Sequence, residues 1–423
     1  VLTLASVLTA SLLPVLAQSV RITGAEVLNI ESGRFQSVDV AVVDGRIAAI
    51  GRDVTDALEG EVETLDLDGA YLLPGLSDSH VHLTGDSNVH GYRRLAVSLP
   101  ATAITGVANA KKTLEAGFTT VRNVGAPGYA DVALRDAIAK GTVPGPRMLV
   151  SGPSIGITGG HCDSNLLPFE YNDRSEGVAD GPWAVREKVR QNVKYGADVI
   201  KFCGTGGVLS KGTRIGAQQF TYEEMAALVD EAHLLGLKVA VHAHGTQGIN
   251  TAIRAGVDSV EHASLINDEG LELAKEKGTF LSMDIYVSDF ILSEGEAAGI
   301  LPESLAKERI VGQRQRESFQ RAVEAGVKVA YGTDAGVYPH GTNARQLSYL
   351  VEWGLTPLEA IRTATLRNAE LFGLEQDIGS IEVGKFADLI AVSQNPLEDI
   401  SVLESVDFVM KEGVVYVNAM ATE

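Results

Sequence analysis

Six side chains that could hold metal ions recur along the chain, each at the end of a stretch with strand-like composition. They are His80, His82, Lys201, His242, His262 and Asp334. In His80-Val-His82 the side chains alternate with a period of two, so both imidazoles face one side of a strand and can reach one ion. A His-x-His pair alone is weak evidence for a metal site. Four histidines and an aspartate, all at strand ends, favour a metal centre.

Lys201 lies in the apolar run Asp198-Val-Ile-Lys-Phe-Cys. An ammonium group is costly to bury there unless it is paired or chemically changed. A lowered pKa would let the amine take up carbon dioxide, and the carbamate formed would offer two oxygens to two metal ions. A lysine in a buried ion pair, or one that reaches solvent, is the alternative. We expect carboxylation because Lys201 belongs to the same series of strand ends as the histidines.

The elements that must position these residues alternate between helix and strand. Six helix-period segments end in a glycine, where a helix C-cap needs a left-handed residue, and a β-rich run follows each of them. These glycines are Gly117, Gly196, Gly236, Gly256, Gly278 and Gly326. Strands are therefore expected near Thr120, Val199, Val239, Val260, Leu281 and Val329, and two more fit near Leu76 and Leu149.

Eight strands that alternate with helices predict an α/β protein with a (β/α)₈ TIM-like barrel. The carboxyl ends of different strands meet at one mouth of such a barrel, which would bring the six side chains together. A doubly wound open sheet is the rival architecture. It is disfavoured because no Gly-x-Gly-x-x-Gly turn follows a first strand.

Two shorter segments with antiparallel patterning flank the barrel. Within the first segment, residues 18–75, apolar and polar side chains alternate from Val20 to Ile50 around Asp44-Gly45, a pair that suits a tight hairpin. A similar texture returns at 384–392 and 407–417, within the second segment, residues 375–423. Because chain ends usually lie close together on a domain, we expect these segments to form one small β-sandwich domain. The metal-binding barrel then occupies residues 76–374.

Residues 1–17 are apolar and uncharged, and Val15-Leu-Ala17 before Gln18 has the spacing of a signal-peptidase site. We expect a secretory signal and an exported protein, periplasmic or secreted; an ordered N-terminal strand or helix is the alternative. The stretch is too short for a comfortable membrane span, and no other stretch is apolar enough. The mature form is therefore expected to have no membrane partner.

The overall composition excludes several classes of protein. The chain has 423 residues with 45% hydrophobic and 21% charged residues, which is typical of globular proteins. Its formal charge of −20 repels phosphate backbones, so nucleic acid is not an expected partner. The two cysteines, Cys162 and Cys203, allow at most one disulfide bridge. We expect Cys203 to be a buried, inert thiol near the site.

The motifs, in order, resemble those of the metal-dependent amidohydrolase superfamily. They are Leu73-Pro-Gly-Leu76, Asp78-Ser-His80-Val-His82, Lys201, Val241-His-Ala-His244-Gly, Glu261-His262, Gly332-Thr-Asp334-Ala-Gly336 and the tail from Gly379 to Leu389. The resemblance extends from about Ile22 to the end of the chain. The strand-four lysine and the His-Ala-His-Gly-Thr run are similar to the prolidase-like branch, which cleaves dipeptides and N-acyl amino acids and includes ochratoxin-degrading amidohydrolases.

The resemblance implies a ligand set and a mechanism. His80, His82 and Asp334 would bind one divalent ion, His242 and His262 would bind a second, and a carbamate on Lys201 would bridge them. Zinc is the expected metal because imidazole and carboxylate ligands suit it. A hydroxide between the ions would attack an amide carbonyl, while Asp334 acts as base and then as acid. By the same resemblance, His244 would stabilise substrate or intermediate.

Substrate contacts are less defined by the sequence. His161, His340 and Tyr286 lie in loops that could reach a small-molecule substrate, whereas His90 and His233 are expected to be structural. A substrate carboxylate could meet any of several cations near loops, namely Arg122, Lys211, Arg214 and Arg345. A cyclic amidase or deaminase, or a catalytically silent scaffold, are the alternative functions. Relatives of this fold commonly form homo-oligomers.

Overall fold

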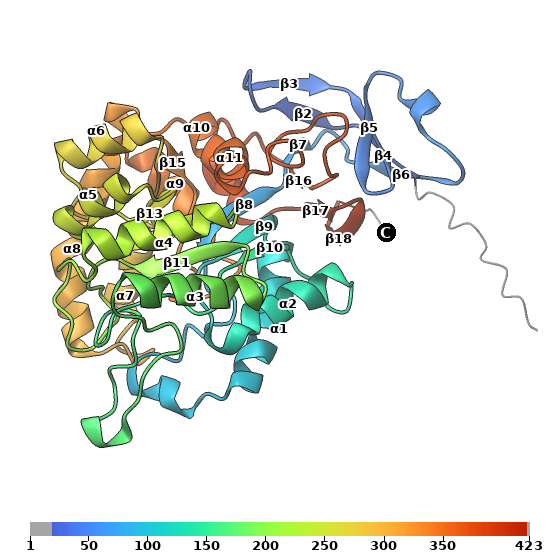
Figure 1. The fold of residues 1–423 in the computed structure, drawn as a ribbon. Coiled ribbons are helices and arrows are strands. Elements are labelled where there is room, and N and C mark those ends of the chain that lie inside the picture. The colour runs from blue at the N-terminus through green and yellow to red at the C-terminus, as the bar shows by residue number, and fades with distance from the viewer. Residues whose placement is uncertain (1–18, 421–423) are drawn as a thin grey trace, which may run out of the picture.

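The computed structural model describes residues 19–420, so the predicted signal segment at residues 1–17 lies outside the described residues. Eight strands form the central barrel (Figure 1). They are β8 (Leu76–Val81), β9 (Phe118–Asn123), β10 (Arg147–Val150), β11 (Val199–Cys203), β12 (Lys238–Ala243), β13 (Ser259–His262), β14 (Phe280–Ser282) and β15 (Val329–Ala330). Every strand predicted from the sequence is present, and neighbouring strands run parallel.

The barrel consists of two runs of paired strands that are joined at two seams. Strands β8 to β10 form one run and β11 to β15 form the other. At one seam the Ile155 N–H donates to the carbonyl of Lys201 over 2.8 Å, and at the other the Ser79 N–H donates to the carbonyl of Tyr331 over 2.7 Å. These bonds close the sheet on itself, which confirms the predicted (β/α)₈ fold.

Helices lie outside the strands (Figure 1). They are α1 (Leu99–Glu115), α2 (Ala130–Ala139), α3 (Pro182–Lys194), α4 (Tyr222–Leu234), α5 (Thr246–Ala255), α6 (Asp268–Lys277), α7 (Val287–Ser293), α8 (Pro302–Ala325), α9 (Arg345–Glu352), α10 (Pro357–Arg362) and α11 (Asn368–Phe372). The six glycines predicted to end helices all have positive φ, between 71° and 99°. A side chain there would be strained, which explains why glycine stops each helix before the next strand.

Two sheets beside the barrel combine the two ends of the chain (Figure 1). One has the order β5-β4-β1-β6 and the other has the order β18-β17-β16-β7-β2-β3. The first comprises Arg46–Gly51, Asp39–Val43, Ser19–Thr23 and Val62–Asp66; the second comprises Val414–Asn418, Phe408–Lys411, Leu389–Val392, Tyr71–Pro74, Glu26–Asn29 and Arg34–Ser37. Buried Ile22 and Val42 from the first sheet share one core with Leu72 and Phe408 from the second. This shared core is that of a small β-sandwich.

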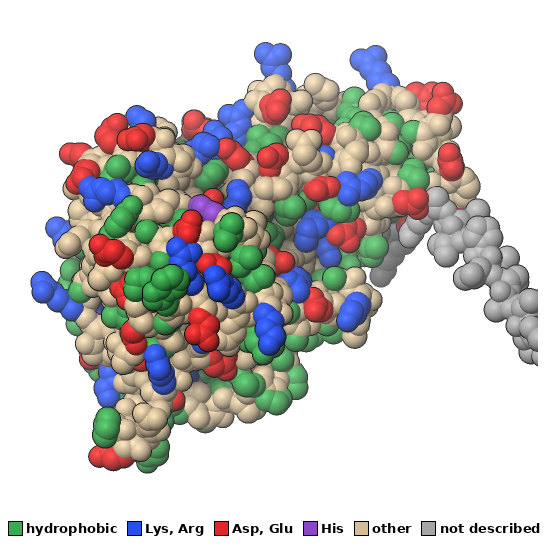
Figure 2. Space-filling view, in the orientation of Figure 1, with side chains coloured by type: hydrophobic (Ala, Val, Ile, Leu, Met, Phe, Trp, Pro, Cys, Tyr) green, Lys and Arg blue, Asp and Glu red, His purple; other side chains and the backbone are tan. Residues whose placement is uncertain are grey.

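The predicted hairpin at Asp44-Gly45 joins β4 to β5, with Val43 paired to Arg46. Both loop residues have positive φ, 50° and 76°, as a two-residue hairpin turn of this hand requires. No helix within residues 19–420 is long and apolar enough to cross a bilayer. Acidic and basic side chains are interspersed over the face shown in Figure 2, with no large patch of one sign.

Candidate active site

A cavity of about 840 Å³ opens at the carboxyl ends of the barrel strands. All six side chains that the sequence predicts as metal ligands line it, as does the predicted catalytic residue His244. They lie on or directly after β8, β11, β12 and β13, and in the loop after β15. The closed barrel brings residues 80 and 334 to one mouth, although more than half of the chain separates them.

His80, His82 and Asp334 form the first cluster. Oδ1 of Asp334 lies 3.4 Å from Nε2 of His80 and 3.2 Å from Nε2 of His82. The other ring nitrogens face protein oxygens: Nδ1 of His80 is within ion-pair distance of Oε2 of Glu261, at 3.0 Å, and Nδ1 of His82 lies 3.2 Å from the carbonyl oxygen of Gly125. Two Nε2 atoms and one carboxylate oxygen therefore converge.

His242, His244 and His262 form the second cluster, in which one ring nitrogen from each lies within 4.8 Å of the others. The ring of His262 is 4.5 Å from that of His242 and stacks on that of His244 at 4.7 Å. His262 also belongs to a group with His80 and Asp334, so it connects the two clusters. The sequence placed His244 beside the substrate, and the structure also puts it within reach of the second metal position.

The ionisation states of three of these histidines suit metal ligands. Burial lowers the pKa of His80 to about 4 and the pKa values of His242 and His244 well below the ordinary value. Neutral imidazole is the form that binds metals. Nε2 of His242 is buried and has no hydrogen-bond partner in the described part of the chain. Such a nitrogen is costly to bury unless a ligand from outside the chain satisfies it, so the donor set fits bound divalent ions.

Two of these residues have unusual backbone conformations. His262 has a φ of 71° and Asp334 a φ of 57°, in the left-handed region that favours glycine. The Asp334 N–H donates to the carbonyl of His80 over 2.8 Å, and Gln315 donates to the carbonyl of His262 over 3.2 Å. Backbone strain of this kind costs about 1–3 kcal/mol per residue and clusters at functional sites.

Lys201 is almost completely buried within this group, and burial lowers its pKa to about 8. Carboxylates nearby, first Glu261 and then Asp334, act in the opposite direction. An amine with this pKa is partly unprotonated near neutral pH. It therefore has the nucleophilic form that reaction with carbon dioxide requires.

Arg122 is not a substrate contact, contrary to one expectation from the sequence. Its side chain is 2% exposed and spans the barrel interior, where it donates to the carbonyl of Ser79, to Ser259 and to Glu261 over 2.6, 3.0 and 2.8 Å. Glu261 in turn lies beside His80. Arg122 thus balances a buried carboxylate that orients a predicted metal ligand, because strand β9 points it inward.

The predicted substrate-contact residues divide into two groups. His161 lines the cavity, stacks on His242 with ring centroids 4.0 Å apart, and bonds through Nδ1 to Ser210 at 2.8 Å. Tyr286 and His340 are not among the residues that line the cavity. The Tyr286 hydroxyl accepts from Arg345 over 3.2 Å, and His340 is buried. Of the three, only His161 lines the cavity, whereas Nε2 of His340 lies 3.2 Å from the backbone carbonyl oxygen of the candidate ligand His82.

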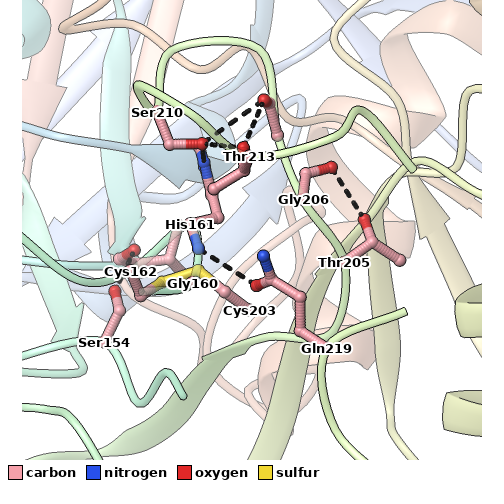
Figure 3. The surroundings of a disulfide bond; sticks show 12 residues. Ser154, Gly160, His161, Cys162, Cys203, Thr205, Gly206, Ser210, Thr213 and Gln219 are labelled. Atoms are coloured by element: carbon pink, nitrogen blue, oxygen red, sulfur yellow. Dashed lines mark hydrogen bonds between the residues drawn. A yellow bond between two sulfur atoms is a disulfide. The ribbon is translucent and has the colours of Figure 1, made fainter. Parts of the chain in front are cut away.

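The prediction of a free thiol at Cys203 is wrong, because Cys162 and Cys203 form a disulfide (Figure 3). Cys203 ends β11, two residues after Lys201. The Cys203 N–H donates to the carbonyl of Ile155 over 2.9 Å, so the segment after β10 lies against β11 and brings Cys162 to it. The bridge fastens the loop that carries His161 to the strand that carries Lys201.

Sequence reasoning missed Asp284, Gln315 and Arg94. Asp284 lies just after β14, and its Oδ1 accepts from Nδ1 of His262 over 2.8 Å and from Gln315 over 2.7 Å. Its position at a strand end was an available signal. Gln315, inside α8, carries no such signal. Arg94 lines the cavity from a short 3₁₀ helix, η2 (Gly91–Ala96), that the sequence pattern did not reveal.

A barrel with histidines and an aspartate at its strand ends is the architecture of a class of metal-dependent hydrolases. The family model "Amidohydrolase family" matches residues 71–416, and the chain belongs to this family. It is therefore an enzyme that acts on carbon–nitrogen bonds, with a histidine-rich metal site.

Similar proteins place the chain more narrowly. Ochratoxinase from Aspergillus niger is 36% identical over 353 residues, which are 79% of this chain and 72% of the relative. The crystal structure of a Xaa-Pro dipeptidase with bound methionine has a TM-score of 0.89 at 39% identity, covering 95% of this chain and all of the other. A prolidase complexed with N-methylphosphonate-L-proline has a TM-score of 0.86 at 31% identity, covering 94% and 99%. The chain thus lies in the prolidase and ochratoxinase branch, which confirms the resemblance seen in the sequence.

Proposed function

We propose that this chain is a two-metal hydrolase of amide bonds in dipeptides or N-acyl amino acids, with ochratoxin A as a further candidate substrate. The observation that carries the proposal is the convergence of two ligand clusters, connected by His262, beside the buried Lys201 in one cavity. The similar proteins support it. One of them holds methionine in its active site, another binds a proline phosphonate, and a third is an ochratoxinase.

Two divalent ions, which we propose to be Zn²⁺, would be held as the ligand clusters suggest. His80, His82 and Asp334 would bind one ion, and His242 and His262 the other, with a carbamate on Lys201 between them. The chemistry that such ions supply when bound is Lewis acidity toward water and toward a carbonyl oxygen. The remaining work falls to side chains of this chain.

Asp334 is the proposed proton shuttle. Burial raises the pKa of its carboxyl, but the imidazoles of His80, His82 and His262 outweigh burial and hold the pKa below its usual range. The carboxylate is therefore ionised at neutral pH and can accept the proton of the attacking water. It would then deliver that proton to the leaving nitrogen as the carbon–nitrogen bond breaks.

Two further histidines are proposed to contact substrate. The ring of His244 is held by a hydrogen bond between its Nδ1 and Ser264 at 2.8 Å, and it would donate to the oxygen of the attacked carbonyl. His161 lines the same cavity beside His242. Its loop is fastened by the disulfide, so its ring is held in place before substrate arrives.

The carbamate on Lys201 has its own test. The free amine attacks carbon dioxide, an N–C bond forms, and one proton leaves to solvent. Lys201→Ala should lose metal and activity, and short carboxylic acids that replace the missing bridge should restore part of both. Lys201→Arg keeps a positive charge but forms no carbamate. Without added acid it should therefore be as inactive as Lys201→Ala. An unmodified ammonium in a metal-loaded crystal structure would disprove the carbamate.

Export to an oxidising compartment and homo-oligomer formation are also proposed. The disulfide supports export, because such bridges persist in secreted and periplasmic proteins and are rare in reducing compartments. A small molecule, rather than nucleic acid, is the proposed partner of a chain with a formal charge of −20. Light scattering on the purified protein measures its oligomeric state directly.

The test of function is a hydrolysis screen with the metal-loaded protein. It would combine a dipeptide library, N-acyl amino acids and ochratoxin A, with dihydrouracil and adenine representing cyclic amidases and deaminases. We expect turnover of linear amides, and no turnover by a His80→Ala, His82→Ala variant prepared in parallel. Turnover of dihydrouracil or adenine alone would overturn the substrate assignment, and no turnover of any compound would favour a silent scaffold.

A further inference from the structure

Four cationic side chains line the cavity, and they differ in whether they have a partner. Lys201 lies among the proposed metal ligands. Arg174 pairs with Asp180 at 3.3 Å, and the Nζ atom of Lys211 donates to the Tyr92 hydroxyl over 2.8 Å. Arg94 also lines the cavity, but its guanidinium has no ion pair or hydrogen bond with any residue between 19 and 420.

Arg94 lies at the cavity, where its side chain is open to solvent. Its side chain is exposed, yet desolvation lowers the pKa of its guanidinium. His90 lines the same cavity, and burial lowers its pKa; the charge of Arg94 lowers it further, while that of Asp334 raises it. The unpaired cation and the proposed shuttle thus act on one imidazole of the same cavity.

Apolar side chains follow Arg94 along the chain and face the same space. Leu95, Val97 and Leu99 line the cavity and remain 45%, 43% and 48% exposed. Apolar side chains left exposed in a concave site are available to a ligand. A positive charge beside an apolar wall is complementary to a molecule that joins a carboxylate to an apolar group.

We propose that Arg94 binds the carboxylate of the substrate, and that Leu95, Val97 and Leu99 contact the apolar side chain of the same amino-acid residue. This inference rests on the proposed function and narrows its substrates to amides whose product amino acid is apolar. A guanidinium presents parallel N–H donors that match a carboxylate, and the pair is stronger where water is excluded. The chain's net charge of −20 repels anions, so a local cation is needed to hold one in the cavity.

The kinetic test compares the fastest substrate of the screen with its C-terminal carboxamide, which removes the negative charge. Arg94→Gln should raise KM for the carboxylate substrate about 10–100-fold, the effect of removing one charge-assisted contact, with little change in kcat. The carboxamide should be cleaved equally well by both proteins. The KM of Arg94→Lys for the carboxylate substrate should lie between the values for wild type and Arg94→Gln, because lysine keeps the charge but lacks the paired donors.

Two further variants make the assignment specific. Arg93→Gln removes the same charge from a neighbouring residue that does not line the cavity, and it should leave the carboxylate preference intact. Lys211→Gln removes the rival cation. If Lys211→Gln lowers the preference and Arg94→Gln does not, the proposal is wrong. Equal effects of Arg94→Gln on both substrates would also overturn it, while leaving the proposed hydrolase function in place.

A binding measurement separates this proposal from the function itself. Calorimetry should show that the metal-loaded protein binds L-methionine, and that it binds L-methioninamide at least tenfold more weakly. Arg94→Gln should remove that difference in affinity. If the wild-type protein cleaves nothing in the screen yet binds in this way, the hydrolase function fails and the Arg94 subsite stands. Since the guanidinium makes no hydrogen bond or ion pair with the described residues, Arg94→Gln should unfold at the wild-type temperature. Equal binding of the two ligands would contradict the subsite.

Discussion

Asp284 holds the imidazole of His262 through a hydrogen bond of 2.8 Å to Nδ1, and this bond leaves Nε2 free to face the cavity. Gln315 donates to the same carboxylate oxygen over 2.7 Å, so the acceptor is itself fixed. His262 belongs to both ligand groups. The orientation of one ring therefore affects both proposed metal positions.

Removal of this contact should weaken metal binding. Loss of such an outer partner typically costs 10–100-fold in metal affinity, so we expect Asp284→Ala to lose about that much in a competition titration with a zinc chelator. Asp284→Asn, whose side-chain oxygen can still accept from Nδ1, is the matched control and should lose less. Metal affinity equal to wild type in Asp284→Ala would mean that the ring needs no such support.

Asp334 has two proposed roles that one substitution separates. Asp334→Asn keeps an oxygen ligand but removes the group that accepts a proton. We expect the variant to retain substantial metal by elemental analysis and to lose at least ~10²-fold in kcat, since general acid–base groups contribute about 10²–10⁴-fold. Turnover within a few-fold of wild type in a metal-loaded preparation would leave Asp334 as a ligand only.

The disulfide should contribute to both stability and substrate handling. The bridge closes a loop over a sequence separation of 41 residues, for which chain entropy gives about 4 kcal/mol. The Cys162→Ser, Cys203→Ser variant should unfold at lower urea concentration and show a raised KM, because the His161 loop is no longer fastened. Reduction of the wild-type protein should reproduce both effects. Two reactive thiols in denatured, unreduced protein from an oxidising compartment would refute the bridge.

Glu308 should make stability depend on pH. Burial raises its pKa from the ordinary 4.5 to about 7, although a hydrogen bond from Ser288 acts in the opposite direction. Below about pH 4.5 the carboxyl is protonated in both the folded and unfolded chains. Between pH 4.5 and 7 the unfolded chain ionises first, so the free energy of unfolding falls.

Glu308→Gln cannot ionise and still accepts from Ser288, so it lacks this loss. Its advantage over wild type in the free energy of unfolding should grow from pH 4.5 to 7, level off above that, and reach at most about 3 kcal/mol. Urea unfolding across this range measures it. A variant that is less stable than wild type at pH 8 would show that the carboxylate is needed there.

The sequence predicts the barrel and the proposed ligands because both have local signals. Six helices are followed by a glycine with a positive φ, as Gly256 and Gly326 have, and a strand begins within a few residues of each. His80 and His262 could be found because they end strands of a barrel whose mouth is known from its architecture. In these cases a few neighbouring residues carry the information.

Features that depend on distant segments were not predictable in the same way. The pairing of Cys162 with Cys203 follows from how the segment after β10 lies on β11. Arg122 points into the barrel rather than toward a substrate because β9 sets its direction and Glu261, on another strand, receives it. Whether a cation such as Arg94 is paired or free is decided by side chains far along the chain.

The central claim is that two divalent ions in this cavity support hydrolysis of an amide bond. Metal-free protein, titrated with Zn²⁺ in the presence of bicarbonate, should regain amide hydrolysis as bound metal rises and should reach a plateau at two equivalents per chain by elemental analysis. Full hydrolysis by protein that contains no metal, or a plateau with no more than one bound ion, would contradict the two-metal site.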